Sequence, residues 1–103
     1  MVEAAYVIRV WGELDVATAP EVHHALGSAI TLPAKKVILD LCGVGFLDST
    51  GLQALIKAQR RLAGLRRGFI VACPDGPVRR ALEIANLIAS FRVAPSLQVA
   101  LAA

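Results

Sequence analysis

The segment Asp48-Ser49-Thr50-Gly51-Leu52 stands where a buried strand gives way to an amphipathic helix. Before it, residues 36–41 (KVILDL) have the apolar, β-branched composition of a buried strand. After it, apolar residues recur at helical spacing on one side, and basic residues occupy the opposite side. The apolar set is Leu52, Leu55, Ile56, Leu62 and Ala63, and the basic set is Lys57, Arg60 and Arg61. This junction predicts a strand followed directly by a helix, which is the repeating unit of α/β folds.

The same alternation extends in both directions along the chain. Strands are predicted at residues 6–11, 36–41, 68–73 and 91–93. Helices are predicted to begin after Thr18, near Ser49, at Pro77 and after Ser96. The third of these helices is predicted to end at Asn86. Thr18-Ala19-Pro20-Glu21 has the pattern of a capping box, in which Thr18 and Glu21 bond reciprocally to the helix start. Gly43-Val44-Gly45 is interpreted as a turn that lets the chain leave the sheet. The sequence thus predicts a single α/β domain over residues 1–103, with a mostly parallel sheet of four or five strands and about four helices.

The composition of the chain excludes several classes of protein. The 103 residues are 56% hydrophobic and 18% charged, which indicates a compact domain with a substantial core. The net charge of +3 is mildly basic, there is no basic arm, and five aromatic residues are too few for a base-stacking platform, so nucleic acid is not expected as a partner. No apolar run reaches the length of about 20 residues that a membrane span needs, and no secretory signal is visible. We therefore expect a cytoplasmic protein that does not bind membranes.

The sequence carries no recognisable pattern for catalysis or for cofactor binding. Gly43 and Gly45 resemble the start of a dinucleotide fingerprint, but Asp48 occupies the position of its third glycine and would repel a pyrophosphate. Ser49 lacks the G-x-S-x-G context of a nucleophile, and the only histidines are the adjacent pair at residues 23 and 24. Neighbouring residues on a helix diverge by about 100°, so this pair is not a metal site. No enzymatic activity, cofactor or metal is expected.

The two cysteines, Cys42 and Cys73, have two interpretations. Neither belongs to a CxxC motif or a zinc knuckle, and the simpler interpretation is a pair of buried thiols in a reducing cytosol. The alternative is a redox-sensitive pair, because both residues stand at the ends of predicted core strands. The distance between the two Cα atoms would decide between the interpretations.

The helix start at Asp48 and Ser49 has two compatible interpretations. Either side chain is suited to cap the helix, because Asp and Ser are favoured at that position. Capping needs only one polar group, whereas the segment offers an acid, two hydroxyls and a glycine. An accessible hydroxyl at a helix N-terminus is a candidate for phosphorylation, with Ser49 favoured and Thr50 as the alternative. Asp48 would repel the phosphate, so the modification is expected to disrupt a binding surface rather than to order a new one.

Three motifs together resemble the STAS family. They are Gly12-Glu13-Leu14-Asp15 before the first helix, VILDL in the second strand, and Phe46-Leu47-Asp48-Ser49-Thr50-Gly51-Leu52. Within the family, the chain is most similar to bacterial anti-sigma factor antagonists of the sporulation and general-stress type. The resemblance extends from Tyr6 to the closing helix, and the spacing between the first and last motifs makes it specific.

The resemblance implies a protein-binding switch rather than an enzyme. The unphosphorylated domain would bind an anti-sigma factor that is also a serine kinase of the GHKL type, and so free a sigma factor. The kinase would phosphorylate the hydroxyl directly after the Asp, which is Ser49 here, and a phosphatase would restore it. ATP and magnesium would belong to the kinase, so this chain would need no cofactor. The residues expected at the partner-binding surface are Glu13, Asp15, Asp48, Gly51 and Leu52.

Two alternatives concern the role and the assembly of the domain. A STAS domain also serves transporter-associated or stressosome complexes, where it would dock without a phosphorylation cycle. Family members often have an additional N-terminal strand, and only eleven residues precede Gly12 here. An exposed sheet edge would favour pairing with a second copy, so a monomer or a weak homodimer is expected. The short N-terminus is equally compatible with a domain taken from a larger protein.

Overall fold

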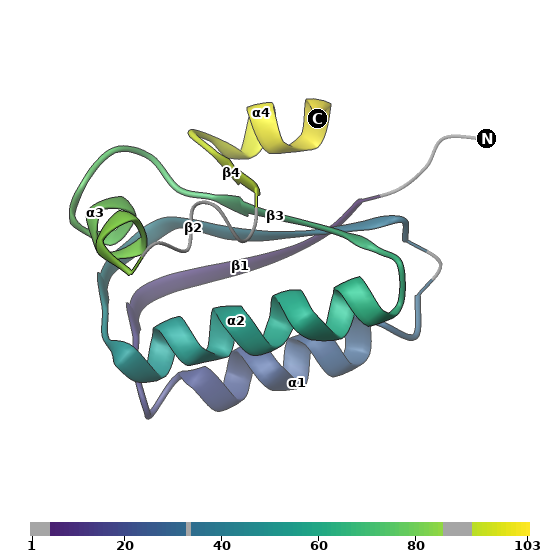
Figure 1. Cartoon of the computed structure of the whole chain (residues 1–103), viewed down its shortest axis with the longest axis horizontal. Helices are drawn as coiled ribbons and strands as arrows, with labels where there is room; N and C mark the ends of the chain where they lie inside the picture. The colour runs from purple at the N-terminus through teal and green to yellow at the C-terminus, as the bar shows by residue number, and fades with distance from the viewer. Residues whose placement is uncertain (1–4, 33, 86–91) are drawn as a thin grey trace.

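The computed structural model describes residues 5–32, 34–85 and 92–103, which form strands and helices in strict alternation (Figure 1). The strands are β1 (Ala5–Leu14), β2 (Lys36–Leu47), β3 (Gly68–Ala72) and β4 (Arg92–Ala94), and the helices are α1 (Ala19–Ala29), α2 (Ser49–Gly64), α3 (Pro77–Ile84) and α4 (Leu97–Ala102). All strand pairs are parallel, in the order β1-β2-β3-β4. The predicted α/β class and parallel sheet are confirmed. The helix end predicted at Asn86 and the strand start predicted at Phe91 lie outside the described residues.

The helices cover the two faces of the sheet unequally. Figure 1 shows α1 and α2 lying together on one face, α4 on the opposite face, and α3 near the carboxyl end of β2. Side chains in β2 alternate between the faces. Val37 and Leu39 therefore join the larger core cluster with α1 and α2, while Ile38 joins a smaller cluster with Ala100 of α4. All the fully buried leucines belong to the larger cluster, so the core lies mainly between the sheet and the α1–α2 layer.

The short helix α4 is held at both of its ends. The Val99 N–H donates to Ser96 Oγ at 3.1 Å, which confirms the predicted cap. At the other end, the Lys36 ammonium donates to three main-chain carbonyl oxygens, those of Ala100 (3.2 Å), Leu101 (2.9 Å) and Ala103 (2.6 Å). A cation at a helix C-terminus also interacts favourably with the helix dipole. These contacts fix α4 against the second face of the sheet.

β1 and β2 extend farther than the sequence predicts. The interpretation of Gly43-Val44-Gly45 as a turn is wrong, because all three residues lie within β2. β1 pairs with this part of β2 through two register shifts, between Arg9 and Trp11 and between Gly12 and Glu13. A Cβ at position 43 would stand 2.6 Å from Trp11 Cδ1, so the exposed Trp11 ring would have to move. The glycines therefore accommodate an irregular pairing of two long strands.

The start of α1 also differs from the prediction. Thr18 stands at the N-cap position but makes no side-chain bond to the first turn of α1, so the predicted capping box is wrong. Instead, Thr18 Oγ1 donates to the Glu13 carbonyl oxygen at 2.8 Å and accepts from the Asp15 N–H at 2.9 Å. The hydroxyl thus holds the connection between β1 and α1. Pro20 lies in the first turn of α1 as predicted, where no amide donor is needed.

Candidate functional site

Two short connections meet at the carboxyl end of the sheet, one after β1 and one after β2. Leu14 and Leu47 are paired at the ends of these neighbouring strands, and Asp15 and Asp48 follow them directly. The Asp48 N–H donates to the Leu14 carbonyl oxygen at 3.4 Å, which joins the two connections. Because adjacent parallel strands end on the same side of the sheet, the fold brings together two acidic motifs that are distant in sequence.

Asp48 is the residue that caps α2. Its backbone is extended (φ −106°, ψ −172°), and its Oδ1 accepts a hydrogen bond from the Gly51 N–H at 3.0 Å. This is the geometry of an N-cap, and it places the carboxylate at the positive end of the helix dipole. Of the two capping interpretations, the one that uses Asp48 holds, and Ser49 is the first residue of α2.

Gly51 is buried where the first turn of α2 packs against the end of β1. A Cβ at this position would collide with the Leu14 carbonyl oxygen and would stand 2.8 Å from Leu47 Cδ1. Glycine therefore allows α2 to begin this close to both strands. Leu52 is half-buried and packs against the larger core cluster. Gly51 and the buried part of the Leu52 side chain thus position residues 48–52 within the fold.

Ser49 is the accessible hydroxyl of this segment. Its side chain is exposed, and no residue in the described part of the chain forms a hydrogen bond with it. Thr50, the alternative hydroxyl, is half-buried. The unpaired N–H groups of a helix's first turn favour an anion at such a position. Accessibility and position both favour Ser49 over Thr50 as a site of modification.

Asp15 uses its carboxylate to shape the connection between β1 and α1. Its Oδ1 accepts hydrogen bonds from the N–H groups of Ala17 at 3.0 Å and of Thr18 at 3.2 Å. Glu13, two residues earlier, has an exposed side chain. The acids expected at the partner-binding surface therefore differ: Asp15 and Asp48 hold the backbone in place, whereas Glu13 extends into solvent.

Three exposed apolar side chains lie on the same segments and are not among the predicted site residues. Trp11, Val16 and Phe46 are 70%, 72% and 50% exposed. Val16 stands in a connection, where polar residues are usual, and this unusual composition is the signal that could have revealed it from the sequence. Aromatic side chains are enriched at protein interfaces, where charged residues form the rim. Apolar and acidic groups side by side suit the binding of a protein better than they suit catalysis.

Of the two cysteines predicted to be buried thiols, Cys73 is buried and Cys42 is exposed. Both are free thiols, and strand alternation directs them to opposite faces: Cys73 joins the larger core cluster with Leu41, whereas Cys42 is exposed on the face that carries Ile38. Burial raises the pKa of Cys73 to about 11. Burial, together with the carboxylate of Asp40, also raises the pKa of Cys42. Because thiolates are the reactive form, the raised pKa values make both thiols less reactive, and the redox-sensitive pair stays a prediction.

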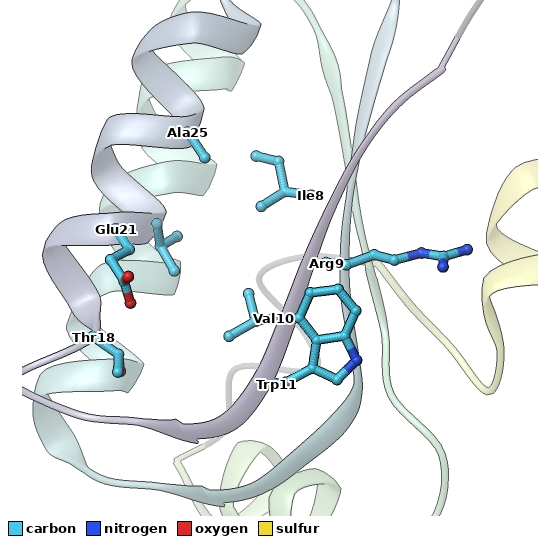
Figure 2. Close-up of a pocket in the computed structure, with 8 residues that line it drawn as sticks. Ile8, Arg9, Val10, Trp11, Thr18, Glu21 and Ala25 are labelled. Carbon is cyan, nitrogen blue, oxygen red and sulfur yellow. The ribbon is translucent and has the colours of Figure 1, made fainter.

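A pocket of about 280 Å³ lies between β1 and α1, and no residue predicted for the functional site lines it. Figure 2 shows Ile8 and Val10 pointing from β1 into the space in front of α1. The polar groups on the α1 side are Glu21 and Thr18. Thr18 is the hydroxyl of this lining, and it is already bonded to the Glu13 carbonyl oxygen. The pocket therefore offers no activated nucleophile.

Residues 5–32, 34–85 and 92–103 contain neither a candidate metal site nor a candidate membrane-spanning helix. No group of three or more His, Cys, Asp or Glu side chains in these ranges is arranged to hold a metal ion. The helices in the same ranges are too short or too polar to cross a membrane. The adjacent histidines at residues 23 and 24 lie on α1, the first half-buried and the second exposed.

Comparisons with known proteins agree with this geometry. The family model for the STAS domain matches residues 2–100. The anti-sigma-F factor antagonist RsfB of Mycobacterium tuberculosis is 30% identical over 95 residues, which cover 92% of this chain and 77% of RsfB. The crystal structure of an anti-sigma factor antagonist from Mycobacterium paratuberculosis has a TM-score of 0.87 at 33% identity, over 95% of this chain and 83% of that one. A sulfate transporter family protein from Wolinella succinogenes shares the fold, with a TM-score of 0.85 at 21% identity over 99% and 87% of the two chains.

The sequence match, the structural match and the joined acidic connections lead to one family. The match to the family model spans all four strands and the first four residues of the closing helix. The relatives above 25% identity named here are anti-sigma factor antagonists. The chain therefore belongs to the STAS-domain family, and within that family it is similar to anti-sigma factor antagonists.

Proposed function

We propose that this protein is an anti-sigma factor antagonist that acts by binding and has no enzymatic activity of its own. Its unphosphorylated form binds an anti-sigma factor that is also a serine kinase of the GHKL type, and a sigma factor is released. Phosphorylation of Ser49 ends this interaction, and a phosphatase restores it. ATP and magnesium belong to the kinase. The cycle runs in the cytoplasm, as part of a stress or sporulation response.

The observation that carries this proposal is that Asp48 caps α2, while the Ser49 side chain beside it stays exposed. Asp48 caps α2 through the Gly51 N–H, so the helix start needs no contribution from the neighbouring hydroxyl. Ser49 is exposed at the first position of α2, where a kinase has access to it. The relatives with 30% and 33% identity are anti-sigma factor antagonists, which supports the same role for this chain.

The charges around Ser49 support an inhibitory phosphorylation. A phosphoserine adds a charge of about −1.5 to −2 at neutral pH. Neither connection carries a Lys or Arg, since residues 11–18 and 43–52 contain only the acids Glu13, Asp15 and Asp48. The added phosphate would therefore repel its surroundings instead of recruiting a local cation. A partner surface that complements these acids would meet an excess of negative charge and would dissociate.

The test uses the full chain and an anti-sigma factor kinase of the GHKL type from the same organism. The two proteins are incubated with magnesium and ATP, and the phosphate is located by mass spectrometry. We expect one phosphate, on Ser49, which is lost in Ser49→Ala and kept in the matched variant Thr50→Ala. Phosphate at another residue, or none, would contradict the switch.

A binding measurement tests the consequence of the modification. Ser49→Ala should bind the anti-sigma factor as tightly as the natural chain and should stay bound after ATP is added. Ser49→Asp should bind more weakly, because it adds a negative charge where the phosphate would stand. Equal affinities of the natural chain and Ser49→Asp would show that charge at this position does not control the interaction.

The second candidate function is a docking module without a phosphorylation cycle, in a transporter-associated or stressosome complex. It is favoured by the likeness in fold to the Wolinella succinogenes protein of the sulfate transporter family. A pull-down distinguishes the two functions. An ABC-transporter ATPase as main partner would favour the docking module, and a GHKL kinase would favour the antagonist.

A further inference from the structure

The outer side of α2 carries a cluster of basic side chains. Lys57, Arg60 and Arg61 stand three and four residues apart, so they are neighbours on the helix surface. Arg66 follows in the turn after α2, and all four side chains are exposed. The sixteen residues of α2 include no Asp or Glu. We call these four residues the α2 basic face.

The α2 basic face has no partner within the described part of the chain. The ion pairs there join Arg9 to Asp40 and Arg79 to Asp75, and no carboxylate pairs with the four residues of the face. The helix is held from its other side, by the buried residues Gly51, Ala54, Leu55, Ala58 and Leu62. Like charges four residues apart destabilise a helix slightly. Apart from the favourable dipole interaction of Arg61 in the last turn of α2, the fold gains little from this concentration of positive charge.

Arg66 stands in the turn after α2, at a position where glycine is usual. Its φ of +57° lies in the left-handed region, which a glycine adopts without penalty after the end of a helix. An L-residue with a side chain costs about 1 kcal/mol or more in that conformation. The turn thus holds an arginine where glycine would be more stable. The Arg66 and Arg67 N–H groups donate to the Ala63 and Leu62 carbonyl oxygens, so this left-handed residue also serves to end the helix.

The α2 basic face is continuous with the side of the helix that presents Ser49. At 3.6 residues per turn, positions 49, 53 and 60 project in nearly the same direction. Ser49, Gln53 and Arg60 are all exposed. A partner lying along this side of α2 would reach from the basic face to the Ser49 hydroxyl.

We propose that the α2 basic face is a docking surface for an acidic segment of a protein partner. Charge complementarity identifies the class of ligand: four exposed cations, three of them arginines, suit a row of carboxylates, which the planar guanidinium binds with two hydrogen bonds. Leu65, which is 48% exposed, adds an apolar contact in the same turn. This inference goes beyond the phosphorylation cycle and does not depend on it.

Two other polyanions fit the α2 basic face less well. Single-stranded nucleic acid is bound by aromatic stacking as well as charge, and neither α2 nor the turn to Arg67 contains an aromatic residue. A membrane-bound helix inserts an apolar face, whereas the apolar face of α2 is already buried against the sheet and α1. An acidic polypeptide requires neither feature.

The first experiment measures binding of a fluorescein-labelled oligoglutamate peptide to the full chain at low salt. The variant Arg60→Gln/Arg61→Gln removes two charges from the face, and Arg80→Gln/Arg92→Gln removes two exposed charges elsewhere as the matched control. We expect the affinity to fall roughly tenfold in the first variant. The control should change it less than twofold. Equal losses in the two variants would overturn the proposal, because binding would then follow net charge alone.

The second experiment separates docking from folding. Arg66→Gly relieves the left-handed backbone strain while it removes one charge from the face. We expect this variant to unfold at a higher temperature than the natural chain and to bind oligoglutamate more weakly. Unchanged affinity would overturn the role of Arg66 in docking.

The third experiment tests the class of ligand. An oligothymidylate and phosphatidylserine vesicles are titrated under the same conditions as oligoglutamate. Weaker binding of both supports an acidic protein segment. Tighter binding of either one, lost in Arg60→Gln/Arg61→Gln, would overturn that assignment in favour of nucleic acid or membrane.

Discussion

The two ends of the parallel sheet differ in charge. Asp15, Asp48 and Asp75 follow β1, β2 and β3, whereas Lys35 and Arg67 precede β2 and β3. In this fold α1 and α2 begin at the carboxyl ends of the strands and finish toward the amino ends (Figure 1). Helix dipoles favour acids at the first end and bases at the second. A net charge of +3 conceals this separation.

The difference also concerns how firmly the charged side chains are bound. At the carboxyl end, the carboxylates of Asp15 and Asp48 accept main-chain hydrogen bonds that define the connections. The α2 basic face, in contrast, makes no ion pair with the described residues. Substitutions at the carboxyl end should therefore change folding and binding together. Substitutions at Lys57, Arg60 and Arg61 should change binding with little effect on folding, whereas Arg66→Gly should change both.

The largest expected effect is at Gly51. Gly51→Ala should lower the free energy of unfolding by about 2 kcal/mol, because the new methyl group collides with the Leu14 carbonyl oxygen. Gly64→Ala is the control in the same helix, where a Cβ meets nothing within 4 Å. It should raise stability by roughly 0.5 kcal/mol. Urea denaturation measures both, and a shift of the same sign in both variants would contradict the close approach of α2 to β1.

The next largest effect is expected at Asp48, whose side chain caps α2 and also carries a negative charge. Asp48→Ala should lower the free energy of unfolding by about 1 kcal/mol, because the Gly51 N–H loses its acceptor. Asp48→Asn keeps an acceptor and should cost much less. If the anti-sigma factor recognises the charge, Asp48→Asn should still weaken its binding. Calorimetric unfolding and titration of the two variants would show whether one side chain has both roles.

A smaller effect is expected at the amino end of the sheet. Lys36→Met removes the ammonium that holds the carbonyl oxygens of Ala100, Leu101 and Ala103. The expected loss is about 0.5 kcal/mol, since a cation at a partly exposed helix C-terminus contributes little more. Hydrogen exchange should quicken in α4 and remain unchanged in α2. Faster exchange throughout the chain would mean that Lys36 supports the whole fold.

A pH dependence from Cys73 is expected only above pH 9, so it is the smallest effect at neutral pH. Its pKa is raised to about 11 from 9.0, so the folded state binds this proton more tightly than the unfolded chain does. The resulting stabilisation is complete below pH 9 and is lost as the pH rises toward 11. Cys73→Val should flatten the stability curve in that window, whereas Cys42→Ser should change it less. Chemical denaturation between pH 8 and pH 11 provides the measurement.

Much of the fold follows from local sequence patterns, and the misassignments arise from contacts between distant segments. The alternation of strands and helices is visible because each element buries one face with its own period. The Thr18 prediction fails because the hydroxyl finds a competing acceptor, the Glu13 carbonyl oxygen, in the preceding connection. The Gly43–Gly45 prediction fails because β1 pairs with this segment, a contact between distant strands that no local pattern reveals.

The candidate site likewise combines features that local sequence patterns predict with features that depend on contacts between distant segments. The acidic motifs and the Ser49 hydroxyl are recognisable from the sequence, and the parallel sheet brings Asp15 and Asp48 together as neighbouring strands require. The packing role of Gly51 depends on a carbonyl oxygen of β1, which no local pattern reveals. The opposite orientations of Cys42 and Cys73 likewise depend on the strand register.

The position of Trp11 has a practical consequence for spectroscopy. It is the only tryptophan in the chain, it is 70% exposed, and its ring lies against Gly43 on the two strands that lead to the Ser49 segment. An exposed indole emits at long wavelength, and its emission shifts to the blue when a partner excludes water from it. Intrinsic fluorescence should therefore report docking at the carboxyl end of the sheet without any label. Docking on the α2 basic face, which contains no tryptophan, should leave the spectrum unchanged.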